Sequence, residues 1–373
     1  MSTGCDDAPE RYRPGMVSWD AALGWRARRQ FLEGPPAASA VDVVRRLQAV
    51  PAWLGDARLA VAIRLGSPGS NELMQAVAAD EVVRVYANRG STQFATPDAA
   101  AALLAVRAAG RQWALKSWVD FYGVAADEWP ALREEVRAAV ADGPLIRDEL
   151  AAAISSSRRF GHVAHAFVDS RDTFLKPFMW QGDLRFGPDR DGAATVQDFT
   201  GVPGWQGVLE LDEAGRAVVV GYLSAYGPAT GDNLQYWLGD GLSAGRARIA
   251  RWLASLRSEG RVVELDVEGT PALALAEHAD DIANATAAGE VRLIPGFDQW
   301  VLGPGTADPN VISTARRASA TRGANLVLVR GRVSGTWKPG KHGVEVGWFD
   351  EEVPAPLDAV AQEAQRMLGP FER

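Results

Sequence analysis

The chain has 373 residues, a formal net charge of −8 and a single cysteine, Cys5. This length exceeds the usual size of one hydrophobic core, so we expect two or three packed domains. One cysteine excludes an intramolecular disulfide and a cluster of thiolate metal ligands. The polar N-terminus and the lack of any stretch of about 20 apolar residues argue against export and against a membrane span, and favour a cytoplasmic protein. The negative net charge argues against indiscriminate binding to nucleic acid.

The N-terminal third of the sequence predicts helices followed by a pair of strands. Apolar spacing and capping residues indicate helices over 18–32, 41–50, 56–65 and 70–80, with Asp56 as a plausible N-cap of the third. Two alternating runs, EVVRVYANRG and STQFATP, indicate a hairpin that turns around residues 88–90. Helices followed by a two-stranded wing are the order of a winged-helix domain.

The same order of helices and strands recurs further along the chain. Two helices over 127–155 and one longer helix over 162–182 precede a turn-rich segment that indicates another wing. A third copy begins with AVVVGYLSAYGPATGDNLQYWLG and ends with TPALALAE. We therefore expect an α+β fold with three tandem winged-helix units over 17–122, 123–205 and 206–288.

The remaining segment, 289–373, changes to strand-like runs separated by Gly and Pro, with a closing helix over LDAVAQEAQRML. It predicts a β-rich C-terminal domain. Within it, residues 309–344 contain no Asp or Glu but seven basic residues: Arg316, Arg317, Arg322, Arg330, Arg332, Lys338 and Lys341. We expect these residues on strands and on the hairpin turn KPGKHG, from which a basic hairpin reaches into a DNA groove. A solvated basic face is the alternative interpretation.

Several sequence segments, taken in order over roughly residues 17–350, resemble one family. They include SWDAALGWRARRQFL, VDVVRRLQAV, NRGSTQFATPDAA, FLKPFMWQGDLRFGP, AYGPATGDNLQYWLG, VRLIPGFDQWVLGPGTADP and GRVSGTWK. The chain resembles the AlkZ-like (YcaQ-related) winged-helix DNA glycosylases, which unhook bulky alkylated purines and interstrand crosslinks, often as self-resistance proteins beside antibiotic pathways. The resemblance implies a C-shaped arrangement of three winged-helix units and a C-terminal β-hairpin that helps to grip DNA.

The resemblance also implies a Gln-x-Gln motif after the second helix, whose glutamines position the water that attacks the sugar carbon. In the favoured register, Pro51 and Trp53 stand where these glutamines would be. One alternative register puts Val50 and Ala52 at the motif, and another keeps a single glutamine, Gln48. No register restores both glutamines, and neither proline nor an indole orients water through a side-chain carbonyl oxygen.

The first wing departs from the family pattern as well. The family commonly reads RGTLH there, whereas this chain reads RGSTQ over 89–93, with Gln93 in place of the histidine. Gln48, Asp56 and Gln93 are therefore the candidate catalytic residues. Asp56 would stabilise positive charge on the sugar, with a purely structural N-cap as the alternative. Trp53 would stack on a base or a planar adduct, with an ordinary core tryptophan as the alternative.

Basic residues on the helices, the first wing and the C-terminal segment are the candidate phosphate contacts. They are Arg45, Arg46, Arg89, Lys176, Arg316, Arg332, Lys338 and Lys341. Such contacts give register and salt-dependent affinity, and a solvated surface is the alternative for the isolated ones. The four histidines show no constellation of metal ligands, and no nucleotide-binding or serine-hydrolase motif is present, so we expect neither a metal nor a cofactor.

These observations favour a DNA glycosylase-like enzyme that removes bulky N7-alkylguanine adducts. Alkylation at N7 puts a positive charge on the purine, so the leaving group needs no protonation and a reduced catalytic set remains useful. The alternative is a non-catalytic member that binds lesions, DNA or the genotoxin itself, and a dimeric transcription factor is a third option. The expected partner is double-stranded DNA that carries bulky adducts, and the expected form is a monomer.

Overall fold

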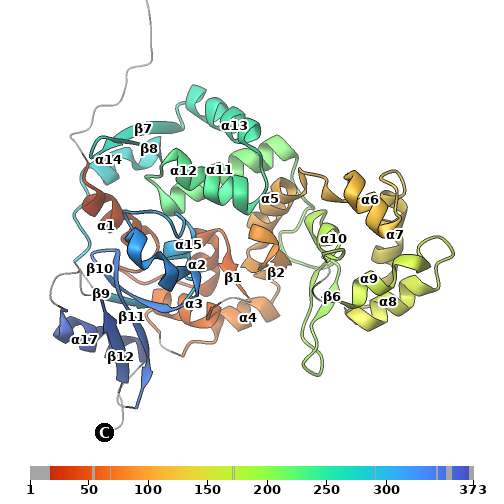
Figure 1. The fold of residues 1–373 in the computed structure, drawn as a ribbon, viewed down its shortest axis with the longest axis horizontal. Coiled ribbons are helices and arrows are strands. Elements are labelled where there is room, and N and C mark those ends of the chain that lie inside the picture. Colours follow the sequence, from red (N-terminus) through yellow and green to blue (C-terminus); the bar gives the residue numbers. More distant parts are fainter. Residues whose placement is uncertain are drawn as a thin grey trace, which may run out of the picture.

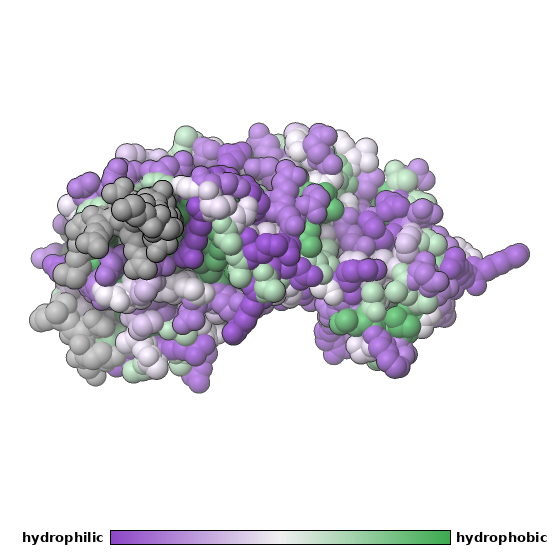
Figure 2. Space-filling view, turned by 90° about the horizontal axis from the view of Figure 1, so that it is seen from above, coloured by the Kyte–Doolittle hydropathy of each residue, from purple (hydrophilic) through white to green (hydrophobic). Residues whose placement is uncertain are grey.

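The computed structural model describes residues 17–52, 55–67, 69–169, 171, 173–289, 291–341, 343–349 and 355–368. The molecule is elongated, with a larger part that holds the N-terminal and C-terminal elements and a smaller part formed by the middle of the chain (Figure 1). Seen from above, its outline is indented between the two parts (Figure 2). None of the described helices is both long and apolar enough to span a bilayer.

Helices and a hairpin form the N-terminal third. The elements are α1 (Trp19–Arg29), α2 (Ala40–Leu47), α3 (Ala57–Leu65), α4 (Glu72–Ala78), β2 (Val83–Tyr86), the short 3-10 helix η1 (Asn88–Gly90), β3 (Thr92–Ala95) and α5 (Pro97–Ala108). The side chains of Ser18, Ser39 and Asp56 cap the first three helices by accepting backbone hydrogen bonds. The predicted helices and hairpin are confirmed, but α2 ends before Gln48, which adopts a positive φ of 66°.

One antiparallel sheet joins the first hairpin to the second. Its strands follow the order β1-β3-β2-β5-β6-β4, where the added strands are β1 (Val50–Pro51), β4 (Leu145–Ile146), β5 (Arg185–Phe186) and β6 (Thr195–Gln197). The two hairpins meet where Arg84 pairs with Phe186. The sheet therefore crosses the boundary at residue 122 that separates the first two predicted units.

Short helices form the smaller part of the molecule. They are η2 (Gln112–Ala114), α6 (Lys116–Tyr122), α7 (Trp129–Ala139), α8 (Arg147–Ser155), η3 (Gly161–Val163), α9 (His165–Val168) and α10 (Lys176–Trp180). The single long helix predicted over 162–182 is wrong, because the chain leaves the helical conformation at Asp169. The Asp169 carboxylate accepts a hydrogen bond from the Arg171 backbone N–H, and a new helix begins at Lys176, with Pro177 in its first turn.

The next segment packs around one long helix, α11 (Leu211–Tyr226). It is followed by α12 (Gly231–Leu234), the π-helix η4 (Gln235–Gly241), α13 (Arg246–Ser258), the separate strand pair β7 (Val262–Val267) and β8 (Thr270–Leu275), η5 (Ala276–His278) and α14 (Ala279–Ala283). Gly215 lets α11 approach α13 closely, since a Cβ there would lie only 2.0 Å from the Trp252 ring. The largest buried apolar cluster lies around α5, α11 and α13.

The C-terminal segment forms an antiparallel four-stranded sheet in the order β12-β11-β10-β9. Its elements are β9 (Val291–Ile294), α15 (Gln299–Leu302), η6 (Thr314–Arg316), α16 (Arg317–Thr321), β10 (Asn325–Val329), β11 (Arg332–Gly340), β12 (Gly343–Trp348) and α17 (Leu357–Leu368). The predicted hairpin lies between β11 and β12. The expectation that all basic residues of this segment lie on strands or the hairpin turn is wrong, because Arg316 and Arg317 belong to short helices.

Candidate active site

A short edge strand brings the altered motif beside the first hairpin. In the β1–β3 pair, Pro51 lies opposite Gln93, and the Ala52 backbone N–H donates to the Thr92 carbonyl at 2.9 Å. Proline is tolerated on β1 because this strand lies at the edge of the sheet. Two residues selected from distant parts of the sequence are therefore direct neighbours. Trp53, the other motif position, lies outside the described residues.

Gln93 is the polar side chain that this strand pair buries. It is 3% exposed, and its Nε2 donates to the Ser91 hydroxyl at 2.7 Å. Within the described part of the chain, no donor reaches its Oε1 atom. A buried amide oxygen without a hydrogen bond is costly, so Gln93 keeps an unused acceptor beside Pro51.

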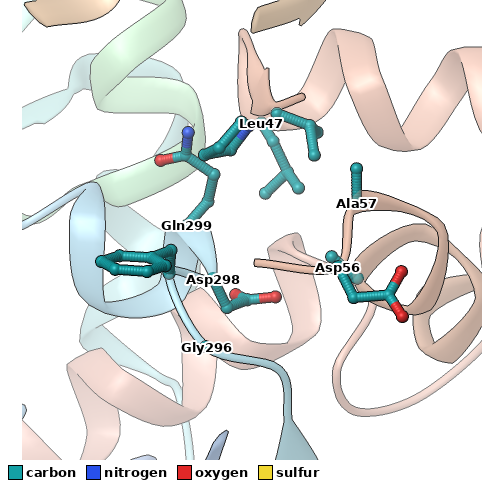
Figure 3. A pocket seen from close by; sticks show the side chains of 10 residues that line it. Leu47, Asp56, Ala57, Gly296, Asp298 and Gln299 are labelled. Carbon is teal, nitrogen blue, oxygen red and sulfur yellow. The ribbon is translucent and has the colours of Figure 1, made fainter. Parts of the chain in front are cut away.

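A small pocket lies between Pro51 and the C-terminal segment (Figure 3). Its walls are Leu47, Val50, Pro51, Asp56, Ala57, Ala60 and residues 296–299, and its volume of about 10 Å³ is what one water molecule needs. The Asp56 carboxylate accepts a hydrogen bond from the Leu59 backbone N–H at 2.9 Å and is exposed. It is directed away from Gln299 on the far wall of the pocket (Figure 3). Asp56 is therefore the N-cap of α3, and its side chain is exposed at the pocket edge.

A buried polar network supports the far wall of this pocket. Asp298 caps α15 and forms a bidentate ion pair with Arg64 of α3, with N–O distances of 2.7 and 2.8 Å. The Tyr226 hydroxyl donates to the Leu47 carbonyl at 2.7 Å and lies 3.3 Å from Gln299 Oε1. Burial raises the pKa of Tyr226 well above its ordinary value, so the hydroxyl stays a donor.

Four polar residues at this wall were not predicted from the sequence: Arg64, Tyr226, Asp298 and Gln299. The available signal was a charged residue inside an apolar run, as in AVAIRL for Arg64 and PGFDQWVL for Asp298. Charged residues are rarely fully buried without a partner, so each should have suggested the other. Among the described residues, no three His, Cys, Asp or Glu side chains are grouped so that they could hold a metal ion.

Comparison with known proteins gives a match along nearly the whole chain. The family described as DNA glycosylase AlkZ-like matches residues 16–369. The chain belongs to this family. It is 34% identical over 356 residues to an interstrand DNA cross-link repair glycosylase of Streptomyces sahachiroi, a match that covers 93% of this chain and 95% of the relative. The solved structure of the Streptomyces sahachiroi DNA glycosylase AlkZ has a TM-score of 0.88 and 32% identity, with 95% of this chain and 97% of that chain covered.

Within the AlkZ-like fold, the candidate residues fall into two separate places. Pro51 and Asp56 line the small pocket, and Gln93 lies beside Pro51 in the sheet. Gln48 instead lines a groove of about 900 Å³ beside α11. Its side chain donates to the Arg45 carbonyl at 3.0 Å, and its amide packs where a Cβ at Gly221 would lie. The structure therefore does not bring Gln48 together with the other three.

The predicted phosphate contacts on α2, the first hairpin and α10 have different surroundings. Arg45 is exposed and paired with Asp42 at 3.1 Å, and Arg46 lies over the Phe31 ring, 5.8 Å from its centroid. Both line the groove that holds Gln48. The Arg89 guanidinium lies 4.2 Å from the centroid of the Tyr236 ring, and Lys176 Nζ lies 5.2 Å from that of Tyr86.

The predicted phosphate contacts of the C-terminal segment are partly engaged by other residues. Arg332 pairs with Asp20 of α1 at 2.9 Å, and the Arg316 guanidinium lies 4.6 Å from the centroid of the Phe349 ring. Lys338 pairs across the hairpin with Glu345 at 2.8 Å, which raises the pKa of Lys338. Lys341 is exposed in the hairpin turn.

Proposed function

We propose that this protein is a DNA glycosylase that hydrolyses the N-glycosidic bond of bulky N7-alkylguanine adducts in double-stranded DNA. The observation that carries the proposal is the match to the AlkZ-like family over residues 16–369. The relative from Streptomyces sahachiroi bears the name of a cross-link repair glycosylase, which supports a bulky adduct as the substrate. Because N7-alkylguanine already carries a positive charge, it departs without an acid, and the reaction tolerates a small catalytic set.

In this proposal Asp56 stabilises the positive charge that develops on the sugar. Its carboxylate is exposed at the edge of the pocket beside Pro51. The free Oε1 of Gln93 is the candidate acceptor that orients a water molecule, since Pro51 offers no polar atom on its side chain. Trp53, which follows Pro51 and Ala52 in the chain, is proposed to stack on the lesion.

The proposal extends to how DNA is held. The three segments of helices and strands over 17–122, 123–205 and 206–288 act as winged-helix units in a C-shape, and the segment 289–373 adds the β11–β12 hairpin. The indentation in the outline (Figure 2) supports such a shape. We propose that the protein works as a monomer in the cytoplasm, in self-resistance to a genotoxin that alkylates guanine.

A second candidate is a non-catalytic protein that binds the lesion or the drug itself. Pro51 favours this function, because it removes both a polar side chain and a backbone N–H from the position where the family resemblance implies a catalytic glutamine. A stacking residue at position 53 would hold an adduct without hydrolysing it. Adduct-dependent affinity without base release is what this function predicts.

Mass spectrometry of the products from adducted duplexes separates the two functions. The glycosylase function predicts free alkylguanine and an abasic site from a panel of N7-guanine adducts. A Trp53→Ala variant should bind the adduct more weakly, by roughly tenfold if one stacked base is lost. Retention of every adduct in intact DNA, beside an active AlkZ-like relative that releases them, would establish the binding function instead.

A further inference from the structure

Basic side chains from separate helices converge at the turn of the first hairpin. Lys176 Nζ, at the start of α10, lies 3.5 Å from the position that a Cβ at Gly90 would occupy, and Arg107 Nη2, near the end of α5, lies 3.9 Å from the same point. Arg147 of α8 donates to the Tyr86 hydroxyl at 3.3 Å. Lys176 Nζ packs against the ring of the same tyrosine. We call Arg107, Arg147 and Lys176 the hairpin cation cluster.

Aromatic rings and backbone carbonyls hold these cations in place of carboxylates. The Arg107 guanidinium lies 4.0 Å from the centroid of the Trp180 ring, and Arg147 donates to the Phe167 carbonyl at 3.0 Å. In the described part of the chain, no carboxylate forms an ion pair with any of the three residues. A ring face or a carbonyl attracts a cation but carries no net charge, so the positive charges of Arg107 and Lys176 are not neutralised. The Asp169 carboxylate, which pairs with Arg171, acts on Arg147 through space without forming an ion pair with it.

Burial makes this arrangement unfavourable while no anion is bound. Desolvation lowers the pKa of Lys176, and the neighbouring charges of Arg107 and Arg147 lower it further. Desolvation also lowers the pKa of Arg107, whose Nε is buried with no acceptor among the described residues. Half-buried like charges without a counterion are costly to the folded state, and a bound anion would offset that penalty.

The cluster lies at the same end of the sheet as the altered motif. The hairpin turn at Gly90 leads directly into β3, where the Thr92 carbonyl accepts the Ala52 backbone N–H at 2.9 Å. The helices α5 and α10, which supply Arg107 and Lys176, lie with β2 at the junction of the larger and smaller parts (Figure 1). An anion bound there would be close to the strand that carries Pro51.

We propose that the hairpin cation cluster binds one phosphodiester of the DNA backbone next to the lesion nucleotide. This inference rests on the proposed function, because it takes DNA as the ligand. A phosphate held between guanidinium and ammonium groups gains charge-assisted hydrogen bonds and fixes the register of the duplex, so that the lesion meets the Pro51–Gln93 strand pair. The cluster thereby positions the substrate and takes no part in breaking the bond.

Binding of a short adducted duplex to a Lys176→Met variant, measured by fluorescence anisotropy over a salt series, tests this site. We expect affinity to fall roughly tenfold or more, and the slope of log affinity against log salt to fall by about one. Lys116→Met is the matched control, since it makes the same change in net charge at an exposed lysine that is already paired with Asp120 at 2.5 Å. Equal affinities and slopes for the two variants would overturn the proposal.

Neutral methylphosphonates, placed one at a time in the duplex, identify the phosphate. A methylphosphonate at the contacted position should weaken DNA binding by the unaltered protein and by the Lys116→Met variant. It should have little further effect on DNA binding by the Lys176→Met variant, which has already lost the contact. Equal losses for all three proteins at every position would contradict a specific contact. Base release by the unaltered protein is measured in parallel. If no base is released but the methylphosphonate effect still depends on Lys176, only the glycosylase function is refuted. If base is released but the methylphosphonate effect does not depend on Lys176, only the phosphate site is refuted.

Stability measurements separate a lost phosphate contact from misfolding. Because the folded protein holds the Lys176 proton less tightly than the unfolded chain, the charged lysine lowers the free energy of unfolding at neutral pH. This penalty fades as the pH rises from the lowered pKa towards the ordinary value of 10.5. Lys176→Met should therefore unfold at the same or higher urea concentration at pH 7 while it binds DNA more weakly. A Lys176→Met variant that unfolds at a lower urea concentration than the unaltered protein would contradict the proposed cost of the half-buried Lys176 charge.

Discussion

Pro51 and Gln93 face each other where the family resemblance implies a catalytic glutamine. The proline removes a polar side chain and a backbone N–H from β1, and the glutamine keeps one amide oxygen without a donor. Any water held beside this strand must therefore be oriented by Gln93 or by groups from other elements, such as the Asp56 carboxylate and the Gln299 amide. Under the proposed function, the side chains that surround the motif must supply the catalytic groups.

Asp56 has two roles in this account, and two substitutions separate them. Asparagine is as good an N-cap as aspartate, so Asp56→Asn should leave the free energy of unfolding nearly unchanged while base release falls, because the negative charge is lost. Asp56→Ala should lower stability by about 1 kcal/mol as well. Urea denaturation and single-turnover base release measure the two effects. Full base release by the Asp56→Asn variant would show that Asp56 acts only as the N-cap of α3.

The capping role of Asp56 was predictable from the sequence, because an aspartate directly precedes a run with helical spacing. The pocket beside it was not predictable. Its other wall is residues 296–299, and Arg64 and Asp298, which join the two walls, are 234 positions apart in the chain. Local propensity carries no information about such a pairing.

At the level of elements, helices with clear caps and hairpins with clear turns follow from the sequence. The prediction of one helix over 162–182 failed because apolar spacing continues through a segment in which Asp169 forms a local turn and a new helix, with Pro177 in its first turn, follows. That break places Lys176 at the start of α10, where it meets Arg107. The feature that the sequence pattern concealed is thus the one that builds the hairpin cation cluster.

Under the proposed function, the β11–β12 hairpin is a second basic contact to DNA, and its two lysines should contribute unequally. Lys338 is paired with Glu345, whereas Lys341 is exposed in the turn. Lys341→Ala should lower the salt slope of binding to undamaged duplex by about one, with a smaller effect for Lys338→Ala and at most ~2 for both. Arg257→Ala, at an exposed arginine paired with Glu264 on the third predicted unit, is the control. An unchanged slope in the double variant would place the hairpin away from phosphate.

At the scale of the whole molecule, one buried ion pair joins the N-terminal helices to the C-terminal segment. Both the Arg64 and the Asp298 side chains are 0% exposed. Removal of one partner leaves an uncompensated buried charge, so Asp298→Ala should lower the free energy of unfolding by ~3–5 kcal/mol. Arg64→Met combined with Asp298→Leu should lower it by less, since no lone charge remains. Urea denaturation measures both, and a loss under ~1 kcal/mol in Asp298→Ala would contradict a structural role for the pair.

The family was predictable at this scale because sequence segments spread along the chain together resemble it, although none of them is specific alone. The joining of the first two hairpins into one sheet was not predictable, since β2 and β5 pair at Arg84 and Phe186, which are far apart in the chain. The overall arrangement therefore follows from the resemblance, and the contacts that position the candidate site follow only from the structure.

The central claim is that an AlkZ-like chain with Pro51 at the motif still hydrolyses an N-glycosidic bond. Mass spectrometry of free base, with an N7-alkylguanine duplex in molar excess over the protein, tests it most directly. The account predicts more free alkylguanine than protein, with an equal amount of abasic sites, and a strong reduction in Asp56→Asn. Adducted DNA that stays intact while the protein binds it more tightly than undamaged DNA would contradict the claim.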